Sequence, residues 1–285
     1  MQRLTTVAAW RAYCDAQRQR GRRVGLVPTM GALHQGHASL FRAAKDHGDV
    51  VVATLFVNPR QFNDDADLRA YPQTPERDRE LAEASGVDCL VEPTLREMWP
   101  DAPGPTPTVV AVRGLSDSLE GDDRPGHFDG VASVVAKLFA VTGPCRAYFG
   151  EKDYQQLAVV RQMVCDLSFD VEVIGSAIVR DADGLAVSSR NVHLTPSGRD
   201  RALALSRAVR AAAATPAPAS VLRALTRDVL DRGDLDVAYA EVVDPVTLVP
   251  SADDESGAAR VLVAAVVDGV RLIDNASVTL TKGER

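Results

Sequence analysis

The sequence has little that would suit a nucleic-acid binder, a disulfide-rich protein or a membrane protein. Its 32 Lys and Arg residues are outnumbered by 39 Asp and Glu residues, so no cationic excess exists to displace the counterions of a nucleic acid. The four cysteines are widely separated and include no CxxC pair, which is typical of a reduced protein. No apolar run approaches the ~20 residues of a membrane helix, and the N-terminal MQRLTTVAAWRAY has no apolar signal segment. We therefore expect a soluble, cytoplasmic protein that binds neither nucleic acid nor membrane, although a few local donors would suffice for a small anionic substrate.

Two motifs that identify common enzyme classes are also missing. No GxSxG elbow and no Walker A pattern occurs, which argues against a serine hydrolase and a P-loop kinase. With 285 residues, 46% of them hydrophobic, the chain can nevertheless bury a sizeable core and form two domains.

Apolar runs alternate with helical stretches over the first two-thirds of the sequence. Residues 24–28 read as a strand, and residues 50–57 are apolar almost throughout, as in a strand covered on both faces. Further strands are expected at residues 87–91, 146–149 and 171–179, and helices at residues 37–47, 75–85, 129–141 and 153–167. The alternation predicts an α/β fold with a Rossmann-like, mostly parallel sheet and helices on both faces.

Residues 94–130 interrupt this alternation. They show no clear periodicity and contain prolines at positions 100, 103, 105, 107 and 125. A stretch of this length is either an excursion from the sheet or a functional loop.

The character of the sequence changes after residue 191. Two helices are expected there, the first capped by Thr195 with Pro196 at its first position. Three strands follow at residues 237–243, 260–267 and 270–273, and a DG turn joins the last two. We expect a Rossmann-like domain over residues 1–180 and a smaller C-terminal α+β domain over residues 181–285.

The stretch PTMGALHQGH directly follows the strand at residues 24–28. His34 and His37 lie near the expected start of a helix, where unpaired N–H groups and the helix dipole suit a phosphate. Gly31 and Gly36 would let the backbone approach a ligand closely. Zinc would need further ligands, and the remaining histidines show no metal-like spacing. A phosphate contact is favoured, while a plain turn and a metal site stay open.

Two polar stretches could meet a second ligand. In FVNPRQF, Asn58 and Gln61 follow a strand, and their amide groups would suit hydroxyl and carboxylate partners in the crevice at the strand ends. An ordinary Asn-Pro turn explains the same residues. In EGDDRPGHFDG, Arg124 and His127 could fold over an anion or belong to an exposed polar loop.

FGEKDYQQL is another strand that runs into a helix. Gly150 and Lys152 are placed where a phosphate could be held, and Asp153 could cap the helix. A lone lysine is otherwise a surface residue. Gln155 and Gln156 diverge by ~100° on a helix, so only one of them can face a ligand.

RDADGLAVSSRN lies near the expected domain boundary. Gly184 allows a tight turn, and Ser188, Ser189 and Arg190 form a compact group of anion donors. A Ser-rich linker is the alternative.

Taken in order, PTMGALHQGH, FVNPRQF, RPGHFDGV, FGEKDYQQL and DGLAVSSRN resemble the pantothenate synthetase (pantoate–β-alanine ligase) family. This family belongs to the nucleotidylyltransferase-like superfamily with an HxGH signature. The resemblance is dense from residue 24 to residue 194 and looser elsewhere, ending in a similar RLIDN at residues 271–275. An isolated HxGH would indicate only the superfamily, whereas five stretches in register are specific.

The resemblance implies an ATP-dependent condensation that serves coenzyme A biosynthesis. The pantoate carboxylate attacks the α-phosphate of ATP, giving pantoyl adenylate and pyrophosphate, and the β-alanine amine then expels AMP. It further implies Mg²⁺ on the phosphates, no protein metal site of its own, a homodimer, and a C-terminal domain that closes over the active site.

The resemblance also assigns residues. The catalytic set would be His37, His34, Lys152, Ser188, Ser189 and Arg190. The ATP site would comprise Met30, Gly31, Ala32, Leu33, His34, Gln35, Gly36, His37, Gly150, Glu151, Lys152, Asp153, Val179, Val187, Ser188, Ser189 and Arg190. The substrate site would comprise Gln61, Gln156, Asn58 and Arg124. The division of roles between His34 and His37 stays open, although His37 is the favoured proton donor.

Two other functions compete with the ligase. A nucleotidylyltransferase of the same superfamily would keep AMP on its product. A non-catalytic nucleotide- or metal-binding protein would retain the five stretches without chemistry.

Overall fold

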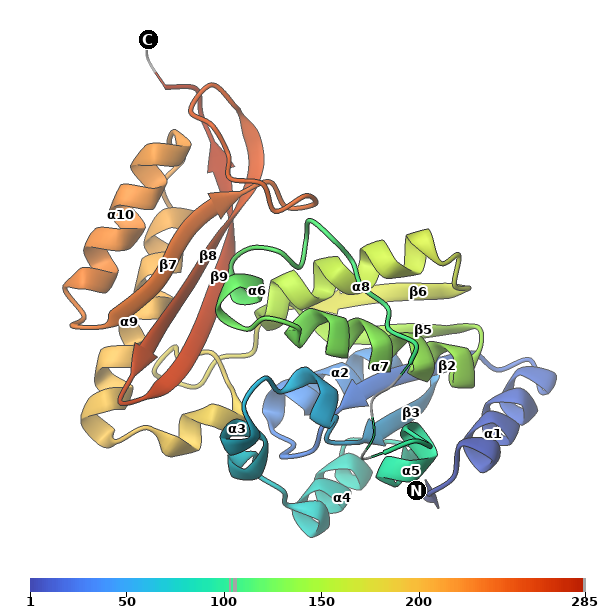
Figure 1. Ribbon diagram of the computed structural model, residues 1–285. Helices are drawn as coiled ribbons and strands as arrows, with labels where there is room; N and C mark the ends of the chain where they lie inside the picture. The colour runs from blue at the N-terminus through green and yellow to red at the C-terminus, as the bar shows by residue number, and fades with distance from the viewer. Residues whose placement is uncertain (103, 105–106, 284–285) are drawn as a thin grey trace. The chain divides into compact units, whose positions relative to one another are not determined.

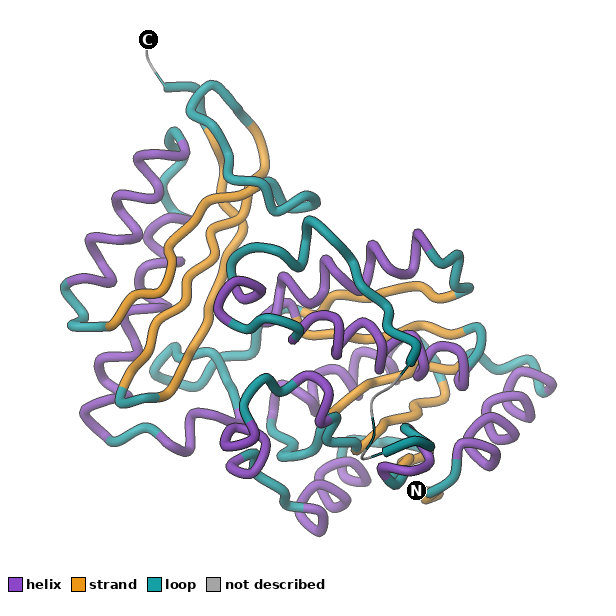
Figure 2. The backbone as a smooth tube through the Cα atoms, in the orientation of Figure 1, coloured by secondary structure: helices purple, strands orange, loops and turns teal. Residues whose placement is uncertain are grey.

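The computed structural model of the chain describes residues 1–102, 104 and 107–283. The chain divides into two compact units, one of residues 1–151 and 155–177, and the other of residues 152–154 together with the chain from residue 178 onward. In each unit the strands gather into one sheet with helices packed outside it (Figure 2). No helix in the described part of the chain is long and apolar enough to span a bilayer.

The first unit is built on a six-stranded sheet whose neighbouring strands all run parallel. In spatial order the strands are β1 (Gln2–Leu4), β4 (Cys89–Val91), β3 (Val50–Leu55), β2 (Val24–Thr29), β5 (Cys145–Gly150) and β6 (Val171–Ser176). From β2 the chain winds toward one edge and from β5 toward the other. The junction of β2 and β5 is therefore the switch point at which doubly wound sheets bind ligands. The predicted parallel sheet is confirmed, and only the short edge strand β1 was not expected.

Helices cover both faces of this sheet (Figure 1). On one face α2 (Gln35–Asp46) buries Leu40 and Phe41 against a cluster that includes Val27 and Ala53. On the other face lie α1 (Val7–Gln19) and α7 (His127–Thr142), which contact each other and β2. Strand β3 is buried along almost its whole length, as its uniformly apolar sequence predicts.

The segment at residues 94–130 is mostly irregular. Its described part includes two one-turn helices, α5 (Leu95–Met98) and α6 (Glu120–Asp123). Pro103 and Pro105 lie outside the described residues. The remaining helices of this unit are α3 (Asp65–Ala70), α4 (Pro75–Ala84) and α8 (Tyr154–Asp166), of which Tyr154 groups with the second unit.

The second unit packs two helices on a three-stranded antiparallel sheet. The elements are α9 (Pro196–Ala213), α10 (Ala219–Asp231), β7 (Asp236–Val243), β8 (Gly257–Val267) and β9 (Val270–Leu280). Thr195 caps α9 by accepting a hydrogen bond from the Gly198 N–H, and Asp268 and Gly269 both adopt positive φ in the hairpin turn. The predicted α+β arrangement is confirmed.

Strand β9 is longer than the sequence predicts. It continues past residue 273 to Leu280 because Asp274 and Asn275, which resemble turn residues in sequence, are buried at 3% and 2% exposure with hydrogen-bond partners. Burial is tolerated here since each polar group is satisfied.

Candidate active site

The loop after β2 is held by a buried carboxylate. The Ala32 N–H and the Leu33 N–H donate to Asp78 of α4 over 3.0 and 2.7 Å, and the Thr74 hydroxyl donates to the same carboxylate over 3.0 Å. Asp78 is only 2% exposed. Gly31 and Ala32 have positive φ, so the loop turns sharply, and the carboxylate holds it in that conformation. Sequence reasoning missed Asp78, since nothing in its polar helix distinguishes it from its neighbours.

The two histidines form the N-terminal cap of α2. Nδ1 of His34 accepts from the Gly36 N–H over 3.1 Å, and Nδ1 of His37 accepts from the His34 N–H over 3.2 Å. The rings lie with centroids 4.1 Å apart. A Cβ on Gly36 would come within 2.9 Å of the His34 ring, so the glycine makes room for this cap. The HxGH spacing is thus a capping box built from imidazoles.

This cap determines where each neutral imidazole carries its hydrogen. Because both Nδ1 atoms accept backbone hydrogen bonds, the hydrogen of each neutral ring resides on Nε2. Two Nε2–H donors therefore stand at the positive end of the dipole of a twelve-residue helix, beside the switch point of the sheet. The arrangement can hold a phosphate. Among the described residues, no group of three or more His, Cys, Asp or Glu side chains is placed to hold a metal ion.

A second polar cluster surrounds the one-turn helix η1 (Pro59–Gln61). The Asn58 Nδ2 donates to Gln61 Oε1 over 3.0 Å and to the Gly130 carbonyl over 3.1 Å. Its Oδ1 accepts from the Trp99 indole N–H over 3.1 Å. Asn58 is 1% exposed, and a ligand could reach its amide only if one of these bonds broke.

His127 and Arg124 complete this cluster. The Gln61 carbonyl can only accept, so His127 Nδ1, 2.7 Å away, carries the hydrogen of that bond. His127 Nε2 then accepts from the Arg124 guanidinium over 3.2 Å. A Cβ on Gly130 would lie 2.1 Å from the Arg60 carbonyl oxygen, so α7 packs on η1 at a distance that only glycine permits. Of the candidate substrate residues, the structure brings together Asn58, Gln61 and Arg124.

The adjacent glutamines of α8 have different surroundings. Gln155 donates to the carbonyls of Leu115 and Ser118 over 2.8 Å each and accepts from the Glu120 N–H over 3.1 Å. Both ends of its amide are engaged in holding that segment, and Gln155 is 5% exposed. Gln156 is half-buried, and no side-chain hydrogen bond between it and another described residue is part of this arrangement, so Gln156 is the member of the pair that stays a candidate for substrate binding.

Lys152 and the loop at residues 187–190 belong to the second unit. Lys152, whose side chain is 18% exposed, has its ammonium 3.6 Å from Asp153. The Val187 N–H donates to the Val179 carbonyl over 2.9 Å, and Ser188 caps the short helix η3 (Ser189–His193) by accepting from the Arg190 N–H.

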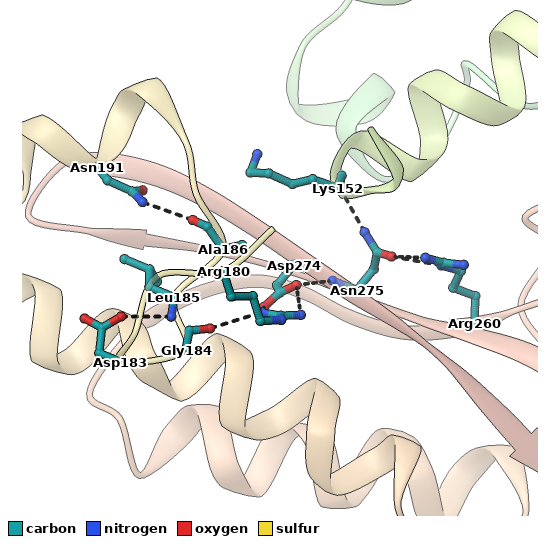
Figure 3. A network of polar contacts seen from close by, with 10 residues as sticks. All are labelled: Lys152, Arg180, Asp183, Gly184, Leu185, Ala186, Asn191, Arg260, Asp274 and Asn275. Carbon is teal, nitrogen blue, oxygen red and sulfur yellow. Dashed lines mark hydrogen bonds and ion pairs between the residues drawn. The ribbon is translucent and has the colours of Figure 1, made fainter. Parts of the chain in front are cut away.

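This loop is fixed by two arginines. Arg180 forms a bidentate pair with Asp274 at 2.6 and 2.9 Å and also donates to the Gly184 carbonyl (Figure 3). Arg199 pairs with Asp181 and Asp183, and its hydrogen bond lowers the pKa of Asp183 below the usual range. The donors at residues 187–190 therefore stand on a braced loop rather than on a linker.

The predicted site residues fall into both units. The first unit contains Met30, Gly31, Ala32, Leu33, His34, Gln35, Gly36, His37, Asn58, Gln61, Arg124, Gly150, Glu151 and Gln156, and the second contains Lys152, Asp153, Val179, Val187, Ser188, Ser189 and Arg190. Gly150 ends β5, and Glu151 begins the short helix η2 (Glu151–Asp153). Sequence reasoning missed Asp78, Asp274 and the positioning contacts of Asn275.

Comparison with known proteins shows the family to which the chain belongs. The family model described as Pantoate-beta-alanine ligase matches residues 2–277. The pantothenate synthetase of Moorella thermoacetica is 48% identical over 282 residues, which cover 96% of this chain and 98% of that protein. That of Mycolicibacterium smegmatis is 51% identical over 272 residues, covering 94% of this chain and 84% of that protein.

Solved structures agree with these sequence matches. The crystal structure of pantothenate synthetase from Thermus thermophilus is 44% identical, with a TM-score of 0.88, covering 97% of this chain and 99% of that chain. Pantoate-beta-alanine ligase from Francisella tularensis, complexed with beta-gamma ATP and beta-alanine, is 31% identical with a TM-score of 0.80, and 97% of each chain is covered.

Proposed function

Because the chain belongs to the pantoate–β-alanine ligase family, we propose that it condenses pantoate with β-alanine to pantothenate at the expense of ATP. We propose the route through pantoyl adenylate, with release of pyrophosphate and then AMP. The observation that carries the proposal is the imidazole capping box, which presents two Nε2–H donors at the N-terminus of α2 beside the switch point of a parallel sheet.

The proposed chemistry needs no nucleophile from the protein, since the pantoate carboxylate itself attacks the α-phosphate of ATP. It needs charged and hydrogen-bonding groups that the protein holds in position. Attack of one anion on another is slow unless donors are aimed at the developing charge. His34, which caps α2, and His37, the third residue of that helix, would supply these donors, and His37 would be the proton donor. Lys152 would supply further positive charge to the phosphates.

Ser188, Ser189 and Arg190 would complete these donors. The rest of the nucleotide site would be lined by Met30, Gly31, Ala32, Leu33, Gln35, Gly36, Gly150, Glu151, Asp153, Val179 and Val187. Mg²⁺ would be held chiefly by the phosphate oxygens of ATP, and it would neutralise phosphate charge when bound.

On the substrate side we propose Gln61 and Gln156 as the residues that bind pantoate, with Gln61 also near β-alanine. Asn58 occupies the Oε1 of Gln61, so the Nε2 of Gln61 is oriented as a donor for a substrate oxygen. Asn58 would then act through Gln61. Arg124 would add positive charge from the adjoining segment, close to the Gln61 carbonyl.

The reaction itself is tested by product analysis. Purified protein incubated with ATP, Mg²⁺, pantoate and β-alanine should form AMP and pantothenate, and exchange of pyrophosphate into ATP should require pantoate but not β-alanine. A nucleotidylyltransferase would instead leave AMP attached to its product. If AMP appears equally without pantoate, the ligase proposal fails. Light scattering on the same sample tests the predicted homodimer, and cell fractionation tests the predicted cytoplasmic location.

The role of the second histidine is tested with a variant that keeps the cap. His37→Gln retains a side-chain oxygen at the third helical position, where Gln commonly serves in a capping box, but lacks the Nε2–H donor of imidazole. Adenylate formation should fall by about 10²–10³, the scale for one preorganised donor, while the melting temperature changes little. His47→Ala is the control, since His47 ends α2 and bonds Tyr148 over 2.9 Å, and it should leave activity nearly unchanged. A loss of less than about threefold in His37→Gln would remove His37 from the mechanism.

A further inference from the structure

The lysine proposed to meet ATP is attached to the C-terminal unit by its main chain. Residues 152–154 stand in the sequence between β5 and the body of α8, yet they group with the second unit. The Asn275 Nδ2 on β9 donates to the Lys152 carbonyl over 2.9 Å. Figure 3 shows this bond at the backbone of Lys152, with the lysine side chain extending away from Asn275.

Asn275 is itself held rigidly. Its Oδ1 accepts from the Arg260 Nε over 2.8 Å and from Nη2 over 2.6 Å. Asn275 is 2% exposed and Arg260 is 7% exposed, so the pair is shielded from water. A buried amide with both ends engaged has one orientation, and its donor end points at the Lys152 carbonyl.

Arg260 also fixes the other end of the short segment. Its guanidinium lies over the Tyr154 ring at 3.7 Å, and the Tyr154 hydroxyl donates to the Pro245 carbonyl over 2.9 Å. The segment from Lys152 to Tyr154 is therefore gripped on both sides of Asp153, by Asn275 at one end and by the Arg260 guanidinium at the other.

We propose that Asn275 and Arg260 are positioning residues for Lys152, which set where its ammonium meets the phosphates of ATP. This inference rests on the proposed function, in which Lys152 contacts ATP. Neither residue needs to touch the substrate, since both act through the lysine main chain. Because a misplacement of about 1 Å can cost about 10²-fold in rate, releasing the Lys152 carbonyl should lower kcat/KM for ATP by about 10- to 100-fold.

One substitution separates the two functions of the Asn275 amide. Asn275→Asp keeps the shape of the side chain and an acceptor for Arg260, but it replaces the donor to the Lys152 carbonyl with an acceptor. The variant should therefore stay folded while losing activity. Arg223→Ala is the control, because Arg223 on α10 also donates to buried main chain, at the Ser251 carbonyl over 3.1 Å, without contact to the lysine segment; its activity should stay within about twofold of wild type.

A double-mutant cycle tests whether Asn275 acts through the lysine. In the wild-type background Asn275→Asp should reduce pantoate-dependent AMP formation by about 10- to 100-fold, whereas in a Lys152→Ala background it should add less than about threefold. An equal loss in both backgrounds overturns the inference. Should Asn275→Asp fail to fold, Arg260→Lys takes its place in the same cycle, since Lys cannot reproduce the bidentate contact. A wild-type protein that forms no pantoate-dependent AMP overturns the proposed function instead, which keeps the two failures distinct.

Discussion

Replacing Gly130 by alanine tests the contact between α7 and η1 directly. The added Cβ would lie 2.1 Å from the Arg60 carbonyl oxygen and 2.7 Å from the Gln61 Cα. These are main-chain atoms, so no side chain can rotate out of the way. The two backbones must separate by more than about 1 Å before the contact reaches van der Waals distance.

Two effects of opposite sign contribute to the stability of Gly130→Ala. Alanine inside a helix is favoured over glycine by about 1 kcal/mol. Overpacking in a rigid contact costs about 1–3 kcal/mol and sometimes more, and here the cost falls at the upper end because the neighbours are backbone. We expect a net loss of about 1–2 kcal/mol. The separation also weakens the bonds from Asn58 to the Gly130 carbonyl and from His127 to the Gln61 carbonyl, so kcat/KM for pantoate should fall by about 10²-fold.

Urea unfolding gives the stability change of Gly130→Ala, and steady-state kinetics with varied pantoate gives its effect on the site. Nucleotide affinity should be unchanged, since the loop at residues 30–37 depends on Asp78 rather than on α7. Ala140→Gly is the control at an exposed position of the same helix, and it should cost about 1 kcal/mol without a kinetic effect. Unchanged or increased stability of Gly130→Ala, with normal pantoate kinetics, would refute the reasoning.

Two further predictions concern buried acids. Asp78→Asn replaces one carboxylate oxygen with an amide NH2 group, which then faces a backbone N–H that has lost its acceptor. The KM for ATP should therefore rise at least about tenfold. Unchanged nucleotide binding by calorimetry would contradict the role of Asp78. Burial raises the pKa of three thiols to about 12, namely those of Cys14, Cys89 and Cys145. Above pH ~9 the unfolded chain loses these protons while the folded chain retains them. The contribution of the thiols to the free energy of unfolding should therefore be fully present below that pH. It should fall by up to about 1.4 kcal/mol per thiol per pH unit toward pH 12. Denaturant unfolding from pH 8 to 11 measures this slope, and a slope that a triple Cys→Ala variant leaves unaltered would show that the thiols do not cause it.

The sequence predicts the fold well wherever burial is uniform. Strand β3 is apolar at nearly every position because both of its faces are covered, and the Asp268–Gly269 turn has residue types that suit positive φ. The prediction from sequence fails at β9, where Asp274 and Asn275 interrupt the apolar pattern. Those residues are buried because Arg180 and Arg260 satisfy them, and the partners lie 94 and 15 residues away in the chain. A periodicity argument cannot anticipate such pairings.

The candidate site shows a related division between what sequence can and cannot predict. Short motifs identify residues at strand ends, such as His37 and Lys152, because chain position alone places them near the carboxyl edge of a sheet. The residues that hold them carry no local signal. Asp78 binds the His37 loop from a separate helix, and Asn275 reaches Lys152 across 123 residues of sequence. Only the folded chain brings these pairs together.

Within the candidate site, the residues that hold neighbouring segments differ from the residues proposed to contact substrate in how far the protein already satisfies their hydrogen-bonding groups. Asn58 and Gln155 have both ends of the amide engaged by protein groups, and each holds a neighbouring segment in place. Gln61 shares its Oε1 with Asn58, and Gln156 is half-buried on the neighbouring helical position. A ligand forms hydrogen bonds most readily with groups that the protein has not already satisfied, because breaking an existing buried bond costs about 1–3 kcal/mol. The rule predicts that substrate contacts come from Gln61 and Gln156, and that Asn58 and Gln155 influence the reaction only through the residues they hold.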